Sequence, residues 1–299
     1  MLRSIILSKA AAAGAYDVKW QATTMPAALD WRYNTYGNGT FVAVNSSLGQ
    51  QQAATSPDGV TWTAQNMPAS TNWFSVAWSG SIFAAIASSS PTGASSPDGV
   101  TWTSRNLPSN TSWQRVAYGG GRFVAVNLSN VSAYSLDGIT WTAGGALPWT
   151  GNWYGLNYGN GQFVAVCNGT NVGATSPDGV TWTMQAMPSA NWLQAAYGNG
   201  LWVAIASGPT TVYATSPDAI TWTSRSMPLS LNWQDIVFAN GMFVVITSNN
   251  TTYAVSSDGL TWTTYLLPSA ANWRRIAFGN NKFVVLVGAN SSVGAVSTV

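Results

Sequence analysis

Residues 56–63 read SPDGVTWT, and this stretch decides the fold because the chain contains it several times. We call it the octet. The same eight letters return at residues 96–103 and 176–183, and close variants stand at residues 135–142, 216–223 and 256–263. A motif that returns about every 40 residues indicates a chain of similar structural units.

Two tryptophan columns run through this repeat. The first column comprises Trp20, Trp62, Trp102, Trp141, Trp182, Trp222 and Trp262. The second column, about eleven residues later, comprises Trp31, Trp73, Trp113, Trp153, Trp192, Trp233 and Trp273. A proline, usually after Met or Leu, separates the two columns, and a Gly/Asn turn with an apolar run such as YGNGTFVAV follows the second. The pattern therefore contains seven repeats.

Each repeat is expected to form four short strands. In one copy, NWLQAAYG is the first strand, LWVAIASG the second, TVYATS the third and AITWTS the fourth. Asn199 and Gly200 form a hairpin signal between the first two strands, and the octet joins the last two. Four strands in about 40 residues, repeated seven times, are typical of a β-propeller. We predict an all-β, seven-bladed β-propeller with four antiparallel strands in each blade.

The two ends of the chain predict how the ring closes. VGAVSTV at residues 293–299 aligns with VGATSPD at residues 172–178, and YDVKWQ at residues 16–21 aligns with DGVTWT. The N-terminal segment is therefore expected to supply the fourth strand of the blade whose first three strands are C-terminal. This pairing would remove two exposed strand edges. The predicted organisation is a tail at residues 1–15 and a propeller at residues 16–299.

The octet resembles the Asp-box, or BNR, repeat of sialidase-type propellers, although it is one residue shorter than the common S-x-D-x-G-x-T-W form. Its Ser hydroxyl and Asp carboxylate suit hydrogen bonds to the turn backbone, and its Gly permits a positive φ. One copy carries Ala219 in place of the Gly, so that copy must strain its turn or adopt another geometry. The alternative role for the octet aspartates is metal binding or acid catalysis. We interpret them as structural turn residues: Asp58, Asp98, Asp137, Asp178, Asp218 and Asp258.

The sialidase resemblance raises glycoside hydrolysis, but the residues that it implies are missing. Sialidases use three arginines for the substrate carboxylate, a Tyr nucleophile with a Glu partner, and an Asp acid; this chain has no Glu, and no position carries over. It also has no His, the commonest general base. A hydrolase with a carboxylate pair at Asp30 and Asp235 is the enzymatic alternative. We predict no enzyme, no catalytic residue, no metal and no cofactor.

Composition excludes other classes of protein. Only 7% of residues are charged, yet 46% are hydrophobic, so the chain is folded rather than disordered. The net charge is +2 and the basic residues are scattered, which argues against a nucleic-acid partner. No apolar stretch reaches the ~20 residues that span a membrane, so we expect no membrane insertion. The single cysteine, Cys167, is interpreted as a buried thiol.

Strand order places the loops on two faces. The octets and the Gly/Asn turns belong to one face, and the proline connections and the loops between second and third strands belong to the other. These last loops vary most and are rich in hydroxyls and amides, as in NSSLGQQQ and SNNTT, which favours recognition there. The second column has two interpretations, sugar stacking or packing between blades. The candidate ligand-binding residues are Trp31, Trp73, Trp113, Trp149, Trp153, Trp192, Trp233 and Trp273.

The functional prediction is a non-enzymatic virion (phage tail) structural protein. We expect this protein to display the propeller for host-surface glycan recognition. The expectation rests on the resemblance of these charge-poor repeats to propellers of phage tail and bacterial surface proteins. Residues 1–15 are expected to anchor it to other virion or surface-assembly proteins, at a virion or extracellular surface. The alternatives are a secreted bacterial lectin and a purely structural spacer or cap without a ligand.

Overall fold

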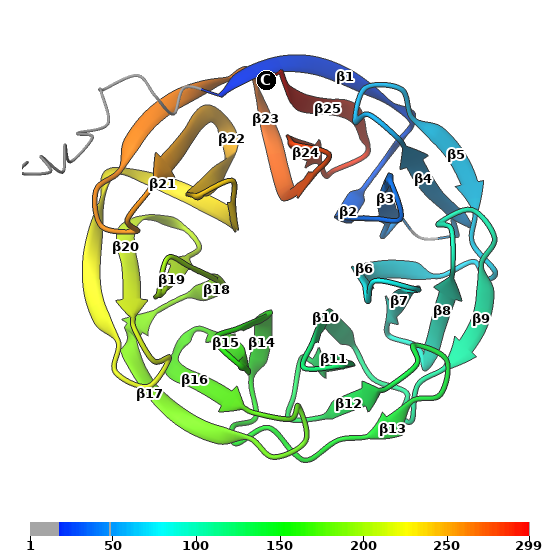
Figure 1. Cartoon of the computed structure of the whole chain (residues 1–299), viewed down its shortest axis with the longest axis horizontal. Coiled ribbons are helices and arrows are strands. Elements are labelled where there is room, and N and C mark those ends of the chain that lie inside the picture. The colour runs from blue at the N-terminus through cyan, green and yellow to red at the C-terminus, as the bar shows by residue number, and fades with distance from the viewer. Residues whose placement is uncertain (1–17, 48, 299) are drawn as a thin grey trace, which may run out of the picture.

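The computed structural model describes residues 18–47 and 49–298, so the predicted tail at residues 1–15 lies outside the described residues. The described residues form β-strands joined by turns and short loops. No helix long and apolar enough to cross a membrane occurs among them. Small sheets surround a central opening (Figure 1). The prediction of an all-β fold is confirmed.

Four sheets contain four consecutive antiparallel strands each. The first contains β2 (Trp31–Gly37), β3 (Thr40–Asn45), β4 (Gln52–Ser56) and β5 (Thr63–Asn66). The second contains β6 (Asn72–Trp78), β7 (Phe83–Ser88), β8 (Thr92–Ser96) and β9 (Thr103–Asn106). The third contains β10 (Trp113–Gly119), β11 (Arg122–Asn127), β12 (Ser132–Ser135) and β13 (Thr142–Ala143). The fourth contains β14 (Asn152–Gly159), β15 (Gln162–Asn168), β16 (Thr170–Ser176) and β17 (Thr183–Ala190).

The other strands are hydrogen-bonded in one series, in the order β1-β25-β24-β23-β22-β21-β20-β19-β18. Their bounds are β1 (Lys19–Leu29), β18 (Trp192–Gly198), β19 (Leu201–Ala206), β20 (Pro209–Ser216), β21 (Thr223–Ala239), β22 (Met242–Ser256), β23 (Thr263–Gly279), β24 (Lys282–Val287) and β25 (Ser291–Thr298). The series is continuous because long strands serve two sheets. Residues 223–232 of β21 pair with β20, whereas residues 233–239 pair with β22. In β23, residues 263–272 pair with β22 and residues 273–279 with β24.

The two ends of the described chain lie side by side (Figure 1). β1 pairs antiparallel with β25, from Lys19 opposite Thr298 to Thr24 opposite Val293. The neighbouring unit is contacted as well, because the Thr23 hydroxyl donates a hydrogen bond of 2.5 Å to the Val60 carbonyl. Strands from opposite ends of the sequence therefore complete one sheet.

One predicted strand begins later than expected. The sequence suggested that the fourth strand of a repeat starts at Ala219, but β21 starts at Thr223 and residues 219–222 belong to the turn. The Asp218 carboxylate accepts the backbone N–H groups of Ile220 and Thr221 at 2.9 and 2.8 Å. Those two donors are therefore occupied by the turn and are not available to a strand ladder.

The core lies between adjacent sheets. One cluster joins Val42 and Val44 of β3 to Trp73 of β6 and Phe83 of β7. The residue before each proline connection is also buried, and this set comprises Met25, Met67, Leu107, Leu147, Met187, Met227 and Leu267. Stacking apolar sheet faces buries the side chains that a single sheet would expose. The packed sheets carry the loops of both faces.

Candidate functional site

Hydrogen bonds between neighbouring units define two faces. On the octet face, a Gly/Asn turn contacts the octet of the next unit: the Asn199 side-chain amide donates to the Ser257 carbonyl at 2.8 Å. On the loop face, a loop between second and third strands contacts the next connection: the Asn168 amide donates to the Trp192 carbonyl at 3.3 Å. The loops therefore share the faces that strand order assigns to them.

Each octet aspartate is occupied by its own turn. Asp58 Oδ1 accepts the N–H groups of Val60 and Thr61 at 2.8 and 3.0 Å, while the Ser56 hydroxyl donates to it at 3.0 Å. These hydrogen bonds, led by that of Thr61, hold the pKa of Asp58 below its ordinary value. The same pair of backbone donors reaches the other octet aspartates: Asp98, Asp137, Asp178, Asp218 and Asp258. The arrangement is that of structural turn residues.

The octet glycines need the left-handed backbone region and also lack space for a side chain. Gly179 has φ +69°, and a Cβ placed there would lie 2.1 Å from Val124 Cγ2. Ala219 keeps the same geometry at φ 62°, with its side chain buried. Of the two outcomes that the sequence left open for this copy, the strained turn is therefore the one found.

Substitution at this position is expected to be costly. Gly179→Ala adds left-handed strain and a clash, so we expect the free energy of unfolding to fall by roughly 2–4 kcal/mol. The matched control is Ala219→Gly, for which released strain offsets a lost buried methyl group, and we expect a change below ~1 kcal/mol. Urea unfolding of both variants measures the difference. A Gly179→Ala variant as stable as the parent would contradict the assigned geometry.

The second tryptophan column lies wholly in the interior. Every one of its seven indoles is 0% exposed. Their N–H groups donate to nearby backbone carbonyls, as from Trp153 to Trp149 at 3.0 Å and from Trp192 to Pro188 at 2.8 Å. No ring face is open to a sugar, so the stacking interpretation is wrong for Trp31, Trp73, Trp113, Trp153, Trp192, Trp233 and Trp273. These indoles pack between sheets; six of them donate to the carbonyl of the residue four positions earlier, and Trp233 donates to Thr210 of β20.

Trp149 differs from the column because its side chain is 47% exposed. It lies in the connection between β13 and β14, on the loop face. Backbone bonds fasten this connection to the β11–β12 loop: Leu147 N–H donates to Asn130 at 2.8 Å, and Gly151 N–H donates to Ser129 at 3.3 Å. An aromatic face beside amide and hydroxyl groups is a suitable surface for a sugar.

The loop-face end of the central opening forms a second site, which sequence reasoning missed. Every first strand has a register shift immediately after its second-column tryptophan. Such a bulge re-aims the extra residue. The residues that follow the seven tryptophans therefore gather around one hollow: Arg32, Phe74, Gln114, Tyr154, Leu193, Gln234 and Arg274. The position after each Trp was the available sequence signal.

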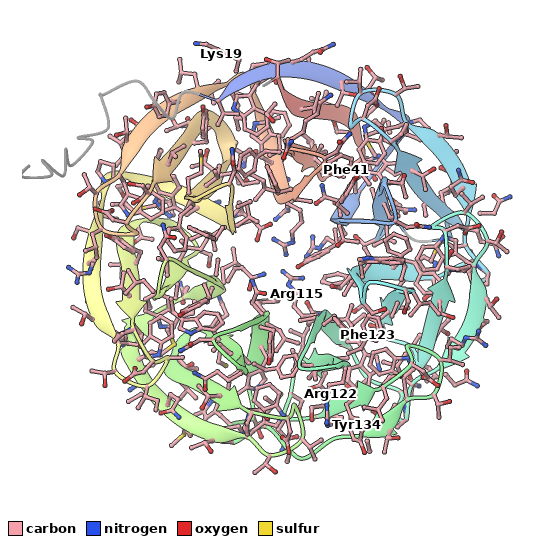
Figure 2. The ribbon with its side chains drawn as sticks, in the orientation of Figure 1. Lys19, Phe41, Arg115, Arg122, Phe123 and Tyr134 are labelled. Atoms are coloured by element: carbon pink, nitrogen blue, oxygen red, sulfur yellow. The ribbon has the colours of Figure 1, made fainter. Side chains whose placement is uncertain are left out.

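We call this hollow of about 200 Å³ the channel mouth; Arg115 and Arg275 also line it. Figure 2 shows Arg115 reaching into the central opening from β10. The guanidinium carbons of Arg115 and Arg275 lie 5.2 and 5.4 Å from the centroid of the Tyr33 ring. Burial lowers the pKa of Arg115, and it lowers the pKa of Arg32 to about 10, so Arg32 stays cationic at neutral pH.

The two aspartates of the enzymatic alternative lie in different surroundings. Asp235 is 4% exposed, accepts the Ile276 N–H at 3.0 Å, and has its pKa raised to about 7 by burial. Asp30 accepts the Ser46 hydroxyl at 2.6 Å and the Ala289 N–H at 3.0 Å in a shallow hollow of the loop face. Neither the channel mouth nor this hollow is lined by both carboxylates.

Metal-binding residues do not gather in the described part of the chain. Among residues 18–47 and 49–298, no group of three or more His, Cys, Asp or Glu side chains is placed to hold an ion. Cys167 is buried, and burial raises the pKa of its thiol. A buried, protonated thiol is a packing group rather than a nucleophile.

Comparison with known proteins shows the fold. No protein-family model matches the chain, and no curated protein matches it. The structure of YCF48 bound to D1 peptide is 17% identical, with a TM-score of 0.75 over 94% of this chain and 95% of that chain. Virginiamycin B lyase from Staphylococcus aureus is 10% identical, with a TM-score of 0.83 over 95% of this chain and 100% of that chain.

A mitotic checkpoint complex structure is 11% identical, with a TM-score of 0.76 over 100% of this chain and 98% of that chain. One of these three similar structures is an enzyme and the others are a peptide complex and a protein assembly. At such identities the likeness concerns the fold and does not extend to activity. The chain therefore has the β-propeller fold.

Proposed function

We propose that the chain is a seven-bladed propeller, closed by its first described strand, that serves as a non-enzymatic recognition module. Seven blades are supported by the four four-stranded sheets together with the three parts into which β21 and β23 divide the long series. Pairing of β1 with β25 supports closure, and the contact of Tyr36 with Gly279 adds to it, since a Cβ at Gly279 would lie 1.9 Å from that ring. The octets act as Asp-box-like motifs that stabilise the turn between the third and fourth strands of their blades.

The proposed ligand of the loop face is a glycan of a host surface. The observation that carries this proposal is the half-exposed indole of Trp149 beside the polar β11–β12 loop. Aromatic faces and uncharged hydrogen-bonding groups match the apolar and hydroxyl surfaces of a sugar ring. A non-enzymatic role is favoured because the separate aspartates form no acid–base pair.

A virion or other extracellular surface assembly is the proposed setting, with residues 1–15 as the anchor to its other proteins. Support for this setting is the resemblance of the charge-poor repeats to propellers of phage tail and bacterial surface proteins. The similar structures that were found include one with a bound peptide and one protein complex, which fits a propeller used for binding. A secreted lectin shares the glycan site but needs no anchor, and a spacer needs no glycan site.

A glycan-array screen of the full chain tests the proposed ligand. We expect saturable binding that Trp149→Ala weakens about tenfold or more, because the indole supplies the stacking surface. Leu136→Ala is the control, since Leu136 is 67% exposed in an octet on the other face. Absence of glycan binding, or equal binding by Trp149→Ala and Leu136→Ala, would contradict the proposal.

A further inference from the structure

The channel mouth concentrates positive charge in a chain that has little charge. Four of its eleven basic side chains line this one hollow: Arg32, Arg115, Arg274 and Arg275. Asp30 lies 3.7 Å from the Arg32 guanidinium, and the buried Asp235 raises the pKa of Arg115. The mouth therefore gathers basic side chains from three strands, β2, β10 and β23.

Two of these arginines are buried with donors unused. Arg115 is 1% exposed and Arg275 is 5% exposed. The Nη1 of Arg115 donates to the Gln114 carbonyl at 3.1 Å, and the Nη1 of Arg275 donates to the Arg274 carbonyl at 2.8 Å. The Nε atoms of all four arginines in the mouth are buried without a hydrogen-bond partner among the described residues. Buried charged donors without acceptors are costly, so the mouth has the chemistry of an anion-binding site.

The crowding of like charges also indicates an anion-binding site. The pKa of Arg32 is lowered first by burial, and the charges of Arg274 and Arg115 lower it further. An anion placed between these guanidiniums would relieve their mutual repulsion and supply the missing acceptors. A carboxylate suits them because a planar guanidinium binds both of its oxygens.

The rest of the mouth is not charged. Phe74, Tyr154 and Leu193 come from three other sheets and line the hollow together with the arginines. The Arg32 guanidinium lies 4.4 Å from the centroid of the Phe74 ring. Gln114, Ser207 and Gln234 complete the lining, and the three apolar side chains can contact an apolar group that a ligand carries next to its anionic one. About 200 Å³ is small for a ligand pocket, which suits the end of a ligand rather than the middle of a chain.

We propose that the channel mouth binds a carboxylate attached to a small apolar group. The ligand is either a free small acid or the C-terminal residue of a polypeptide. Both present a carboxylate next to an apolar group. The carboxylate lies among the guanidiniums of Arg32, Arg115, Arg274 and Arg275. The apolar group contacts Phe74, Tyr154 and Leu193. This site does not depend on Trp149, so it stands apart from the proposed glycan site.

Calorimetric titration of the full chain with N-acetyl-leucine and with N-acetyl-leucinamide tests the site. The two probes share size and apolar group, but only the first carries a carboxylate. We expect the acid to bind and the amide to bind at least tenfold more weakly, because charge-assisted hydrogen bonds are lost. A peptide ending in leucine that binds more tightly than the free acid identifies a chain end; equal affinity identifies a small acid. Equal binding of acid and amide, or no binding of either, would overturn the proposal.

Two variants tie the binding to these arginines. Arg115→Met keeps the length of the buried side chain and is expected to weaken acid binding roughly tenfold or more. Arg274→Gln, at a partly exposed position, gives a second variant that is decisive if the first does not fold. Arg105→Met on the outer strand β9 and Trp149→Ala are controls expected to bind as the parent does. Undiminished binding by a folded Arg274→Gln variant would show that the arginines do not form the site.

Discussion

A chain that lacks residues 1–29 is expected to lose its cooperative fold. The deletion removes β1, exposes the edge of β25 and removes the buried side chains of Thr23 and Met25. Each buried apolar side chain contributes about 1.5–3 kcal/mol and each ladder hydrogen bond about 0.5–1.5 kcal/mol. The summed loss is comparable with the whole stability of a typical domain, about 5–15 kcal/mol. Thermal unfolding followed by circular dichroism measures the effect.

The matched control for this deletion lacks only residues 1–15. It keeps β1, so its unfolding temperature should match that of the full chain. If these residues anchor the protein in an assembly, the shorter deletion should abolish incorporation while leaving the propeller folded. A chain without residues 1–29 that unfolds at the temperature of the full chain would show that β1 is not needed for closure.

The second large effect is expected at Trp153. Its side chain is 0% exposed and packs in a cluster with Leu156 and Phe163. Trp153→Ala leaves a cavity and an unpaired Trp149 carbonyl, so we expect the free energy of unfolding to fall by about 3–5 kcal/mol. Denaturant unfolding gives this value directly.

Trp149→Ala is the comparison for that experiment. This substitution removes a half-exposed ring and keeps the backbone carbonyl that accepts the Trp153 N–H, so stability should change by less than ~1 kcal/mol. Equal losses in the two variants would contradict the division of the tryptophans into interior and surface groups.

The fold could be predicted from the sequence because the sequence repeats. Trp and Gly at fixed offsets mark strands and turns that recur, so one copy explains the others. The predicted start of the fourth strand was wrong because the Asp218 carboxylate accepts the backbone N–H groups of Ile220 and Thr221. Strand periodicity does not reveal this side-chain effect.

The site was less readable. A large aromatic residue at a strand start can face the core or a ligand. The folded structure distinguishes the two cases, because it buries Trp153 and exposes Trp149. The channel mouth was missed because Arg32, Arg115 and Arg274 are scattered along the sequence. A bulge after each second-column tryptophan turns the following residue toward the centre, which brings Arg32 and Arg274 to the hollow that Arg115 of β10 also lines.

A paired cysteine substitution directly tests the proposed closure of the ring by β1 and β25. Ala22 lies opposite Ala295 in the ladder, and the native Cys167 is buried. Opposed residues of antiparallel strands have the Cα separation that a disulfide needs. Mass spectrometry of the non-reduced Ala22→Cys, Ala295→Cys protein should show an intramolecular disulfide linking these two positions. Two free, alkylatable thiols at positions 22 and 295 in the folded protein would contradict the closed ring.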